Sequence, residues 1–519
     1  MARILPPNVS AANFEKALQA FSSIVGKEWV LATEEDQQTY LDGFALADAE
    51  TMMPAGGVSP ASVEEVQAIV KVANQYKIPL WPVSAGKNLA YGGSNPRMRG
   101  TFVLDMIRMN KVLEVNEEHG YAVVEPGVNY FEMAKHLESI GSNLWMSLPA
   151  PGWGSLMGNS LDRGAGYTAY GEHAANICGM EVVLASGEVI RTGMGAQEGN
   201  KAWHLYKYGF GPSWDGAFMQ SGMGIVTKVG IWLMPAPGAS ASVSINLQNE
   251  SDLGAAVDVL RPLRLNNIID SNATIASPIR RSSVGSMQSD WYDGEGAMPR
   301  DAVEALVAKQ GFGWWGCNFT IMDANAAMID ERLKLALPGF EAIPGAEITI
   351  DRWDAATGKG KSPKPMPNLF AFQMLNWRGG PGGHVDFSPV VPTTGKNATE
   401  IYDLTSSRFY EHGFDYFGGF TFFKRHMINT SVLIYNKNNP VMRQNAMDVF
   451  GKLVNEAGKM GYAGYRTHLT FMDQMADQFD YNDHALMRFN EQMKNAADPN
   501  GIIAPGKSGI WPTAYKGEK

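Results

Sequence analysis

The chain has 519 residues, more than one hydrophobic core supports, so we expect at least two domains. Its formal net charge of -10 excludes nucleic acid and anionic membranes as main partners, because both bind basic surfaces. Only two cysteines occur, Cys178 and Cys317, which excludes a disulfide framework and a cysteine-rich metal site.

Neither a membrane span nor a targeting segment is expected. No run of about 18 apolar residues occurs. The N-terminal stretch MARILPPNVSAANFEKALQAF lacks the long apolar core and the cleavage site of a signal peptide. We therefore expect a cytoplasmic protein, with a periplasmic location as the alternative, because a low cysteine content suits both compartments.

The first half of the chain alternates predicted helices and short strands. Ser59-Pro60 predicts the start of a helix, with the serine as its cap and the proline in its first turn. Val63, Val66, Val70 and Ala73 give this helix one apolar face. Short strands are predicted at residues 78–83, 101–105, 111–116 and 121–125, and a hairpin at 180–192.

A domain boundary is predicted at Pro235-Ala236-Pro237-Gly238, after a strand at 229–234. Beyond it, a strand at 241–245 and a helix at 251–260 begin a new pattern. The stretch 359–367 alternates lysines with prolines and glycines and predicts an exposed loop. The turn-rich tail at 500–507 is expected to pack back onto the first domain.

Three glycine-rich stretches follow predicted strands, at 84–93, 152–173 and 209–227. A diphosphate needs several backbone N–H groups aimed at one point, and glycines let the backbone come close to it. The first stretch alone is neither a dinucleotide fingerprint nor a Walker loop, and an ordinary surface loop explains it as well. Together, the three favour a long cofactor in an extended groove, with an ordinary loop-rich α+β domain as the alternative.

These stretches, with Asn376-Trp377-Arg378-Gly379-Gly380 and Tyr465-Arg466-Thr467-His468, resemble the vanillyl-alcohol oxidase and p-cresol methylhydroxylase flavoprotein family. The resemblance extends from Phe14 to Ile510. It implies an α+β flavoprotein of two domains. Residues 1–237 and the C-terminal segment 465–519 would form an FAD-binding domain of the vanillyl-alcohol oxidase type, and residues 238–464 a cap or substrate domain with an antiparallel sheet. The FAD-binding residues it implies are Ser84, Gly86, Lys87, Asn88, Gly158, Asn159, Asp162, Gly166, Gly222, Ile225 and Lys507.

The resemblance also implies a covalent link between FAD and His384. In the oxidase branch of the family, a histidine at this position carries the flavin, and a neutral imidazole nitrogen is a suitable nucleophile. The methylhydroxylase branch uses a tyrosine slightly earlier, where this chain has Leu375. An ordinary hydrogen-bonded loop histidine is the alternative for His384 without the resemblance.

Tyr91, Tyr465 and Arg466 are the catalytic residues that the resemblance implies for a phenolic substrate. Hydride leaves a benzylic carbon more easily when the para oxygen is a phenolate, because the product is then a neutral quinone methide. A phenol has a pKa near 10, and a close opposite charge lowers such a pKa by roughly 1–3 units. An arginine beside two hydroxyl donors therefore favours the reactive anion.

Several family positions differ in this chain. Ala150 replaces an aspartate of the oxidase branch, and no general base is identified. Acidic and histidine side chains of the methylhydroxylase correspond to Ala371, Gly419, Ile428 and Val432. These replacements predict a less polar, roomier pocket that suits a bulkier substrate, such as a lignin-derived alkylphenol.

The function expected from the sequence is FAD-dependent oxidation of 4-alkylphenols or 4-hydroxybenzyl alcohols at the benzylic carbon. The alternatives are a 2-hydroxy-acid dehydrogenase on the same fold and a non-catalytic flavin-binding subunit. A hydroxylase or dehydrogenase with a cytochrome c or blue-copper acceptor is favoured over an oxidase. A homodimer is expected, and no metal.

Overall fold

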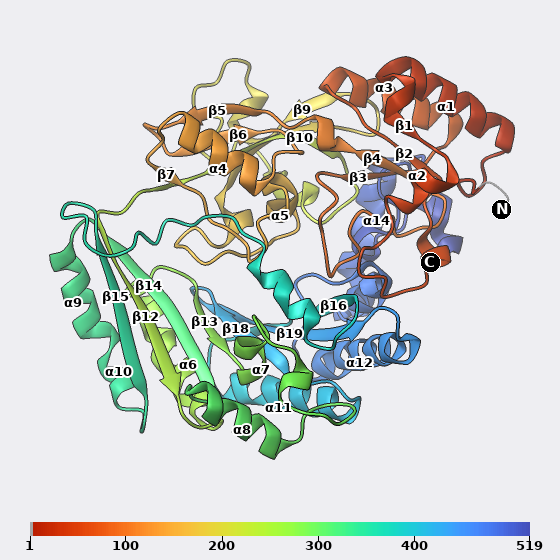
Figure 1. Cartoon of the computed structure of the whole chain (residues 1–519). Coiled ribbons are helices and arrows are strands. Elements are labelled where there is room, and N and C mark those ends of the chain that lie inside the picture. The colour runs from red at the N-terminus through yellow and green to blue at the C-terminus, as the bar shows by residue number, and fades with distance from the viewer. Residues whose placement is uncertain (1–3) are drawn as a thin grey trace.

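Two halves of the chain face each other in the structure, a computed structural model that describes residues 4–519 (Figure 1). The first half (red to yellow) holds a four-stranded, a five-stranded and a two-stranded sheet, and the second half (green to blue) holds one large sheet. Helices and strands occur in both halves, which confirms the predicted α+β class. Among residues 4–519, no helix is both long enough and apolar enough to span a bilayer.

The N-terminal sheet has four strands in the order β1-β2-β4-β3. Its strands are β1 (Val30–Leu31), β2 (Gly56–Val58), β4 (Phe102–Asp105) and β3 (Leu80–Val83). The central strand β4 runs parallel to both neighbours and is almost wholly buried, as the apolar run of its residues predicts. Helices α1 (Ala11–Val25) and α3 (Val63–Tyr76) pack against each other beside this sheet, and α2 (Glu34–Gln38) contacts β2.

Helix α3 begins later than predicted. Ser62, not Ser59, is its cap: the Ser62 hydroxyl accepts a hydrogen bond from the Glu65 amide at 3.2 Å. The Glu65 carboxylate accepts one from the Ala61 amide at 2.7 Å, which fixes the turn before the helix. The amide of Ser59 instead donates to the carbonyl of Trp29, so Ser59 continues the pairing of β2 rather than starting the helix.

The second sheet of the first half has five antiparallel strands in the order β5-β6-β10-β8-β9. Its strands are β5 (Val112–Asn116), β6 (Tyr121–Val124), β10 (Ile225–Trp232), β8 (Ile177–Val183) and β9 (Val189–Arg191). The predicted hairpin at 180–192 is the β8–β9 pair. Helices α4 (Tyr130–Ser139) and α5 (Leu156–Leu161) follow β6 along the chain, and β7 (Leu144–Trp145) pairs with β11 (Met234–Pro235).

The second half contains an eight-stranded sheet in the order β15-β12-β14-β13-β18-β19-β16, with β17 paired to β19. All its pairings are antiparallel, as the family resemblance implied. The strands are β12 (Ala239–Leu247), β13 (Ala273–Ala276), β14 (Trp315–Asp323), β15 (Glu347–Asp354), β16 (Gly382–Phe387), β17 (Val390–Pro392), β18 (Phe417–Phe422) and β19 (His426–Asn436).

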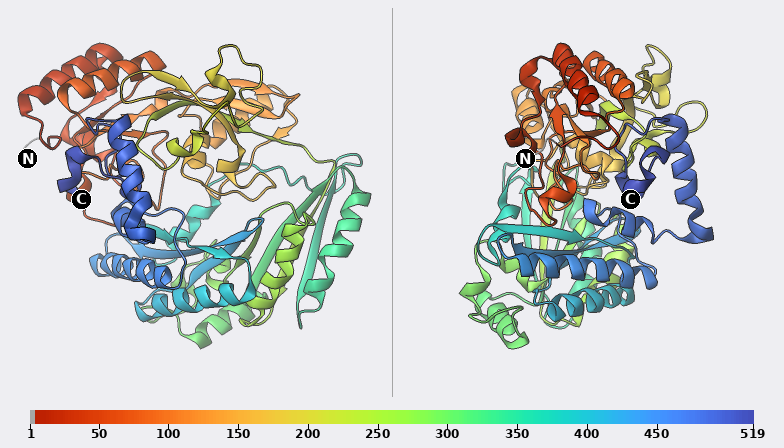
Figure 2. Two further views of the ribbon diagram at one scale, coloured as in Figure 1. Left: turned by 180° about the vertical axis from the view of Figure 1, so that it is seen from behind. Right: turned by 90° about the vertical axis from the view of Figure 1, so that its right-hand side faces the viewer.

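Helices cover the outer face of this sheet, and its other face is turned toward the first half (Figure 2). The covering helices are α6 (Asp252–Leu265), α9 (Ala326–Ala336), α11 (Gly395–Glu411) and α12 (Pro440–Lys459). The short helices α7 (Pro278–Ser282) and α10 (Pro338–Glu341) contact β18 and α9, respectively, and α8 (Arg300–Gln310) packs against α7. The predicted boundaries at 237/238 and 464/465 stay a prediction; the whole eight-stranded sheet falls between them.

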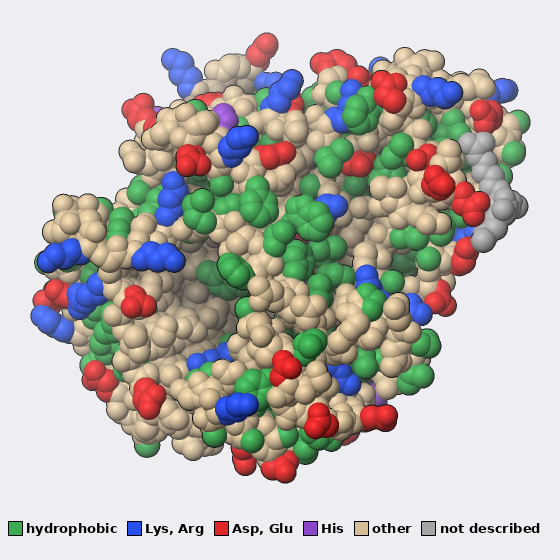
Figure 3. All heavy atoms as spheres, in the orientation of Figure 1, with side chains coloured by type: hydrophobic (Ala, Val, Ile, Leu, Met, Phe, Trp, Pro, Cys, Tyr) green, Lys and Arg blue, Asp and Glu red, His purple; other side chains and the backbone are tan. Residues whose placement is uncertain are grey.

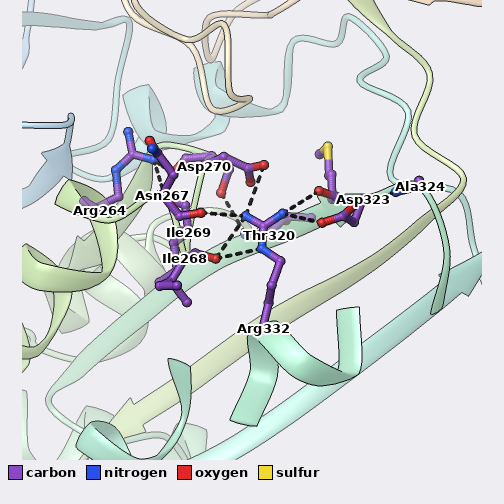
Figure 4. A network of polar contacts seen from close by, with 11 residues as sticks. Arg264, Asn267, Ile268, Ile269, Asp270, Thr320, Asp323, Ala324 and Arg332 are labelled. Atoms are coloured by element: carbon purple, nitrogen blue, oxygen red, sulfur yellow. Dashed lines mark hydrogen bonds and ion pairs between the residues drawn. The ribbon is translucent and has the colours of Figure 1, made fainter. Parts of the chain in front are cut away.

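Two arginines, the buried Arg264 and the half-buried Arg332, brace the segment of the second half between α6 and β13. Arg332 of α9 forms ion pairs with Asp270 at 3.2 Å and with Asp323 at 2.9 Å (Figure 4). Nearby, Arg264 donates to the side-chain oxygen of Asn272 at 3.0 Å. The amide of Asn272 in turn donates to a backbone carbonyl of the first half, 2.8 Å away. This network fixes the segment through which the two halves touch.

The C-terminal segment returns to the first half, as predicted for the tail. After α13 (Met472–Ala476) and α14 (Tyr481–Ala497), Ile503 pairs with Leu80 of β3, and both are fully buried. The tail is held by a buried ion pair, in which Lys494 Nζ lies 2.6 Å from the Asp498 carboxylate. The same ammonium donates to the carbonyls of Gly222 and Ile503, each at 2.6 Å.

We predict that Lys494→Met lowers the stability of the folded protein by about 3–5 kcal/mol, because it leaves a buried carboxylate without its counter-charge. Thermal unfolding followed by tryptophan fluorescence measures the change. The matched control is Lys516→Met, which breaks the more exposed pair with Glu491 and is expected to cost at most about 1 kcal/mol. Equal unfolding midpoints for the two variants would contradict a stabilising role for the buried pair.

Candidate active site

A cavity of about 470 Å³ lies between the two halves. Its walls come from the loop after β3, the start of α5, the stretch 218–226 and the tail on one side, and from β16, β18 and β19 on the other. Trp153 and Phe372 both line the cavity and meet edge to face, and Trp153 is 44% exposed, so the cavity reaches the surface there. Hydrophobic side chains gather at the centre of this face of the molecule (Figure 3).

The glycine-rich loop 84–93 forms one wall of the cavity. Gly92 has a φ of +106°, and a Cβ there would lie 2.4 Å from the side chain of Leu469. Gly158, in α5, packs so closely on the loop that a Cβ would lie 2.3 Å from Ser84 Oγ. Side chains at these two glycines would push the loop out of place, which explains why glycine is needed at both.

Asp162 joins three distant parts of the chain on this wall. Its carboxylate accepts hydrogen bonds from Asn88 Nδ2 at 2.9 Å and from Lys507 Nζ at 3.0 Å. Burial opposes the charge of Asp162, but Lys507 and Arg466 outweigh it and lower the pKa of the carboxyl. The ionised group therefore anchors both the glycine-rich loop and the C-terminal tail at neutral pH.

Tyr91, Tyr465 and Arg466 come together at one end of the cavity. The Arg466 guanidinium lies over the Tyr91 ring, 3.7 Å from its centroid, and 5.9 Å from that of Tyr465. Its Nη2 also donates to Asn88 Oδ1 at 2.8 Å. Burial opposes the charge on Arg466, but the neighbouring Tyr91 and Tyr465, with Asp162 and Asp386, raise the pKa of the guanidinium.

The two tyrosines stay protonated at neutral pH. Burial raises the pKa of Tyr91 well above 10, although Arg466 acts in the opposite direction. Burial likewise raises the pKa of Tyr465. Because each hydroxyl can rotate, both can donate a hydrogen bond to an oxyanion placed beside Arg466.

His384 lies on strand β16 rather than in a loop, and it is 93% buried in the cavity wall. Its Nδ1 is 2.6 Å from one carboxylate oxygen of Asp386. The other oxygen of Asp386 accepts a hydrogen bond from the Tyr91 hydroxyl at 3.4 Å. Asp386 thus connects the histidine to the tyrosines, and a carboxylate acceptor at Nδ1 leaves the lone pair on Nε2.

Most of the predicted FAD-binding residues line this cavity: Ser84, Gly86, Lys87, Asn88, Gly158, Asn159, Asp162, Ile225, His384 and Lys507. Gly166 and Gly222 do not line it. The Gly166 carbonyl accepts the hydrogen bond from Asn272, and the Gly222 carbonyl accepts the one from Lys494. Both glycines support the wall from behind, and their roles toward FAD stay predictions.

Sequence reasoning missed three residues of the cavity. Asp386 shares the face of His384 two residues along the strand, and this spacing could have identified it. Gln220 donates to the carbonyl of Tyr465 at 2.9 Å, a contact that the sequence does not indicate. Arg280 of α7 also lines the cavity, on the side of the large sheet. Of the positions where this chain differs from the family, Ala150, Ala371 and Val432 line the cavity.

Comparisons with known proteins fit this geometry. Residues 54–193 match a family model described as "FAD binding domain", and residues 368–508 match one described as "FAD linked oxidases, C-terminal domain". The 4-cresol dehydrogenase [hydroxylating] flavoprotein subunit of Pseudomonas putida is 34% identical over 98% of both chains. The 1'-carboxy-chondrochloren decarboxylase of Chondromyces crocatus is 29% identical over 96% of this chain and 98% of the relative. The structure of 4-ethylphenol oxidase from Gulosibacter chungangensis, in an isoeugenol complex, superposes with a TM-score of 0.94 at 35% identity, covering 99% of this chain and all of the other.

Proposed function

Because the chain belongs to the vanillyl-alcohol oxidase and p-cresol methylhydroxylase flavoprotein family, we propose that this protein, with FAD as the hydride acceptor, oxidises a para-substituted phenol at the carbon next to the ring. The relatives named for 4-cresol and 4-ethylphenol match it over almost its full length, which supports 4-alkylphenols as substrates. The observation that carries the proposal is the contact of Arg466 with Tyr91 and Asn88 at the end of the cavity.

The cavity suits FAD. The close packing of Gly158 on Ser84 keeps side chains out of the groove, and Ser84, Lys87 and Asn88 supply polar groups along it. When bound, FAD supplies the acceptor for the hydride that leaves the benzylic carbon. The residues of the chain then have two tasks, to ionise the phenol and to hold the ring so that its side chain reaches the flavin.

Ionisation is the task of the Arg466 end. A phenol oxygen beside the guanidinium and the two tyrosine hydroxyls becomes a phenolate more easily, because a close cation lowers a phenol pKa by roughly 1–3 units from about 10. As the hydride leaves, an electron pair of the phenolate oxygen is delocalised into the ring and forms a C=O bond. The product is a neutral quinone methide. Water can add to a quinone methide formed from a 4-alkylphenol, or this product can lose a proton from the next carbon to give an alkenyl side chain. A quinone methide formed from a 4-hydroxybenzyl alcohol can instead lose its hydroxyl proton to give a carbonyl.

Arg466→Met is expected to lower the rate of flavin reduction by 4-ethylphenol at pH 7 at least about 30-fold, because fewer bound phenols are ionised. The rate should recover as the pH rises toward 10, where the substrate ionises without help. Anaerobic stopped-flow absorbance measures the reduction, and FAD content should change little. Arg408→Met, which breaks ion pairs on the outer helix α11, serves as the control. Equal reduction rates in Arg466→Met and the unaltered protein would refute the phenolate role.

The covalent link to FAD is proposed for His384. Its Nδ1 faces Asp386, so the nitrogen left to bond the flavin is Nε2. The imidazole is held in place by Phe44, whose ring centroid lies 4.8 Å from that of His384. Phe44 is fixed in turn by Asp42, whose carboxylate accepts from the Phe44 amide at 3.0 Å and pairs with His468 at 3.3 Å.

His384→Ala is expected to abolish acid-stable yellow colour, since no other nucleophile replaces the imidazole. Asp386→Asn keeps the shape of the side chain at position 386 but weakens the hydrogen bond to His384 Nδ1. A smaller fraction of the flavin in this variant should therefore be covalently bound. Acid precipitation followed by absorbance of the pellet measures the bound fraction. His412→Ala, at the end of α11, should keep the colour. A yellow pellet from His384→Ala would show that the link is elsewhere.

The electron acceptor and the assembly are also proposals. One relative is named a flavoprotein subunit, which supports a protein acceptor such as a cytochrome c or a blue-copper protein, whereas another is named an oxidase. We favour the protein acceptor, and hence a hydroxylase or dehydrogenase. A homodimer in the cytoplasm stays a prediction.

A protein acceptor predicts slow reoxidation of the reduced enzyme by air. Mixing photoreduced enzyme with air-saturated buffer, and separately with oxidised cytochrome c, should give a much faster flavin recovery with the cytochrome. Rapid recovery with dioxygen would instead make the enzyme an oxidase. The same spectra discriminate the alternatives: bleaching by lactate or glycolate would indicate a 2-hydroxy-acid dehydrogenase, and no bleaching by any substrate a non-catalytic subunit.

A further inference from the structure

Arg280 is a charged side chain of the cavity that the phenol chemistry does not use. It lies on the short helix α7 and lines the cavity from the side of the large sheet. Among the described residues, no ion pair or side-chain hydrogen bond of its guanidinium is formed, whereas two other cations of the cavity, Lys507 and Arg466, each have a polar partner. A cation in a partly enclosed pocket without a counter-charge is costly, and an anionic ligand would remove that cost.

The position of Arg280 follows from the close approach of α7 to β18. A Cβ placed on Gly419 would lie 3.3 Å from Arg280 Nη1, so the guanidinium lies directly over this glycine. The same Cβ would lie 2.3 Å from the carbonyl oxygen of Ile275, so only glycine fits where β18 passes between β13 and the arginine. Thr430, which lines the cavity, is paired with Gly419 in the sheet and adds a hydroxyl beside it.

The register of the sheet sets the span between Arg280 and the phenol end. Val432 of β19 is paired both with Asp386 of β16 and with Phe417 of β18, and Gly419 is two residues beyond Phe417. With strands about 4.8 Å apart and a rise of about 3.4 Å per residue, Gly419 lies about 12 Å from Asp386 at the backbone. Asp386 contacts Tyr91 at the phenol end.

We propose that Arg280 binds a carboxylate at the end of the substrate's side chain, so that the preferred substrates are para-substituted phenols bearing an acid group. A phenol with a propanoic acid side chain has polar ends about 9 Å apart, from bond lengths near 1.5 Å. With hydrogen bonds of about 2.8 Å at each end, such a substrate spans about 15 Å, which is of the same order as the backbone separation of about 12 Å between Asp386 and Gly419. Phe417 and Val432, which also line the cavity, supply the apolar surface for the carbons between them.

This inference rests on the proposed function and adds its second recognition site. Lys87 is not an alternative carboxylate site of the same kind, because it belongs to the glycine-rich loop of the FAD groove and lies over the Trp153 ring at 4.5 Å. A small 2-hydroxy acid also carries a carboxylate. If it bound through that group to Arg280, the molecule would be too short to reach the tyrosines at the other end of the cavity.

The test compares flavin reduction by 3-(4-hydroxyphenyl)propanoate and by 4-propylphenol, which differ in the acid group. Anaerobic stopped-flow gives the ratio of their second-order rate constants. The unaltered holoenzyme should prefer the acid, and Arg280→Met should lower the ratio of acid to alkylphenol about 10- to 100-fold, as for a lost charge-assisted hydrogen bond. Arg280→Lys should restore part of the preference, because it keeps the charge without the planar fork.

Arg281→Met is the matched control on the same helix. The Arg281 guanidinium donates to Asn246 Oδ1 at 2.7 Å and lies over Phe312, away from the cavity, so its loss should leave the ratio unchanged. A wild-type preference for 4-propylphenol, or equal losses with both substrates in Arg280→Met, would overturn the assignment. Failure of both phenols to reduce the flavin of the unaltered protein would overturn the proposed function itself, which distinguishes the two outcomes.

Discussion

The contact between Arg466 and the glycine-rich loop is the interaction on which the site depends. The arginine follows the last strands of the large sheet, whereas Tyr91 and Asn88 belong to the first half of the chain. The stacking at 3.7 Å and the hydrogen bond at 2.8 Å therefore exist only when the C-terminal segment, which begins at Tyr465, has returned to the first half. The position of the Arg466 charge thus depends on tertiary structure, and the buried Lys494–Asp498 pair helps by holding the tail in the first half.

Burying so much charge requires that each group have a partner. Asp162 is paired with Lys507 and Asn88, and Asp386 is shared by His384 and Tyr91. Each carboxylate oxygen is thereby satisfied by a different segment of the chain, so the charges position one another as well as stabilise the closed form. The net effect is a rigid, polar end wall beside an apolar cavity, which suits a ligand that is anionic at its phenolic end and apolar along its ring.

Much of this arrangement was predictable from the sequence, because it rests on local patterns. Glycines that permit close approach marked the loop at 84–93, and the Tyr465-Arg466 motif marked the substrate end through the family resemblance. The start of α3 was wrong because Ser59 and Ser62 are both acceptable caps, and only the pairing of Ser59 with Trp29 decides between them. Arg280 was missed for a related reason: its neighbour Arg281 has the same sequence context, and only the fold shows which of the two faces the cavity.

The replacement of acidic and histidine side chains of the family at positions that include Gly419 and Val432 has a different meaning once Arg280 is placed. From the sequence alone, these positions predicted a pocket that is merely larger and less polar. In the structure, the backbone of β13 and the Arg280 guanidinium both lie close to Gly419, and Arg280 lines the cavity, so the local charge is positive rather than neutral. A Cβ at Gly419 would lie 2.3 Å from the carbonyl oxygen of Ile275, so no carboxylate side chain fits at this position to neutralise Arg280. The glycine therefore keeps the cation available, and the cavity has a cation at each end with apolar walls between them. Such a site selects substrates by length as well as by charge. The strand register fixes the distance between the two cations, and a substrate must have the right length for its two polar ends to reach both of them.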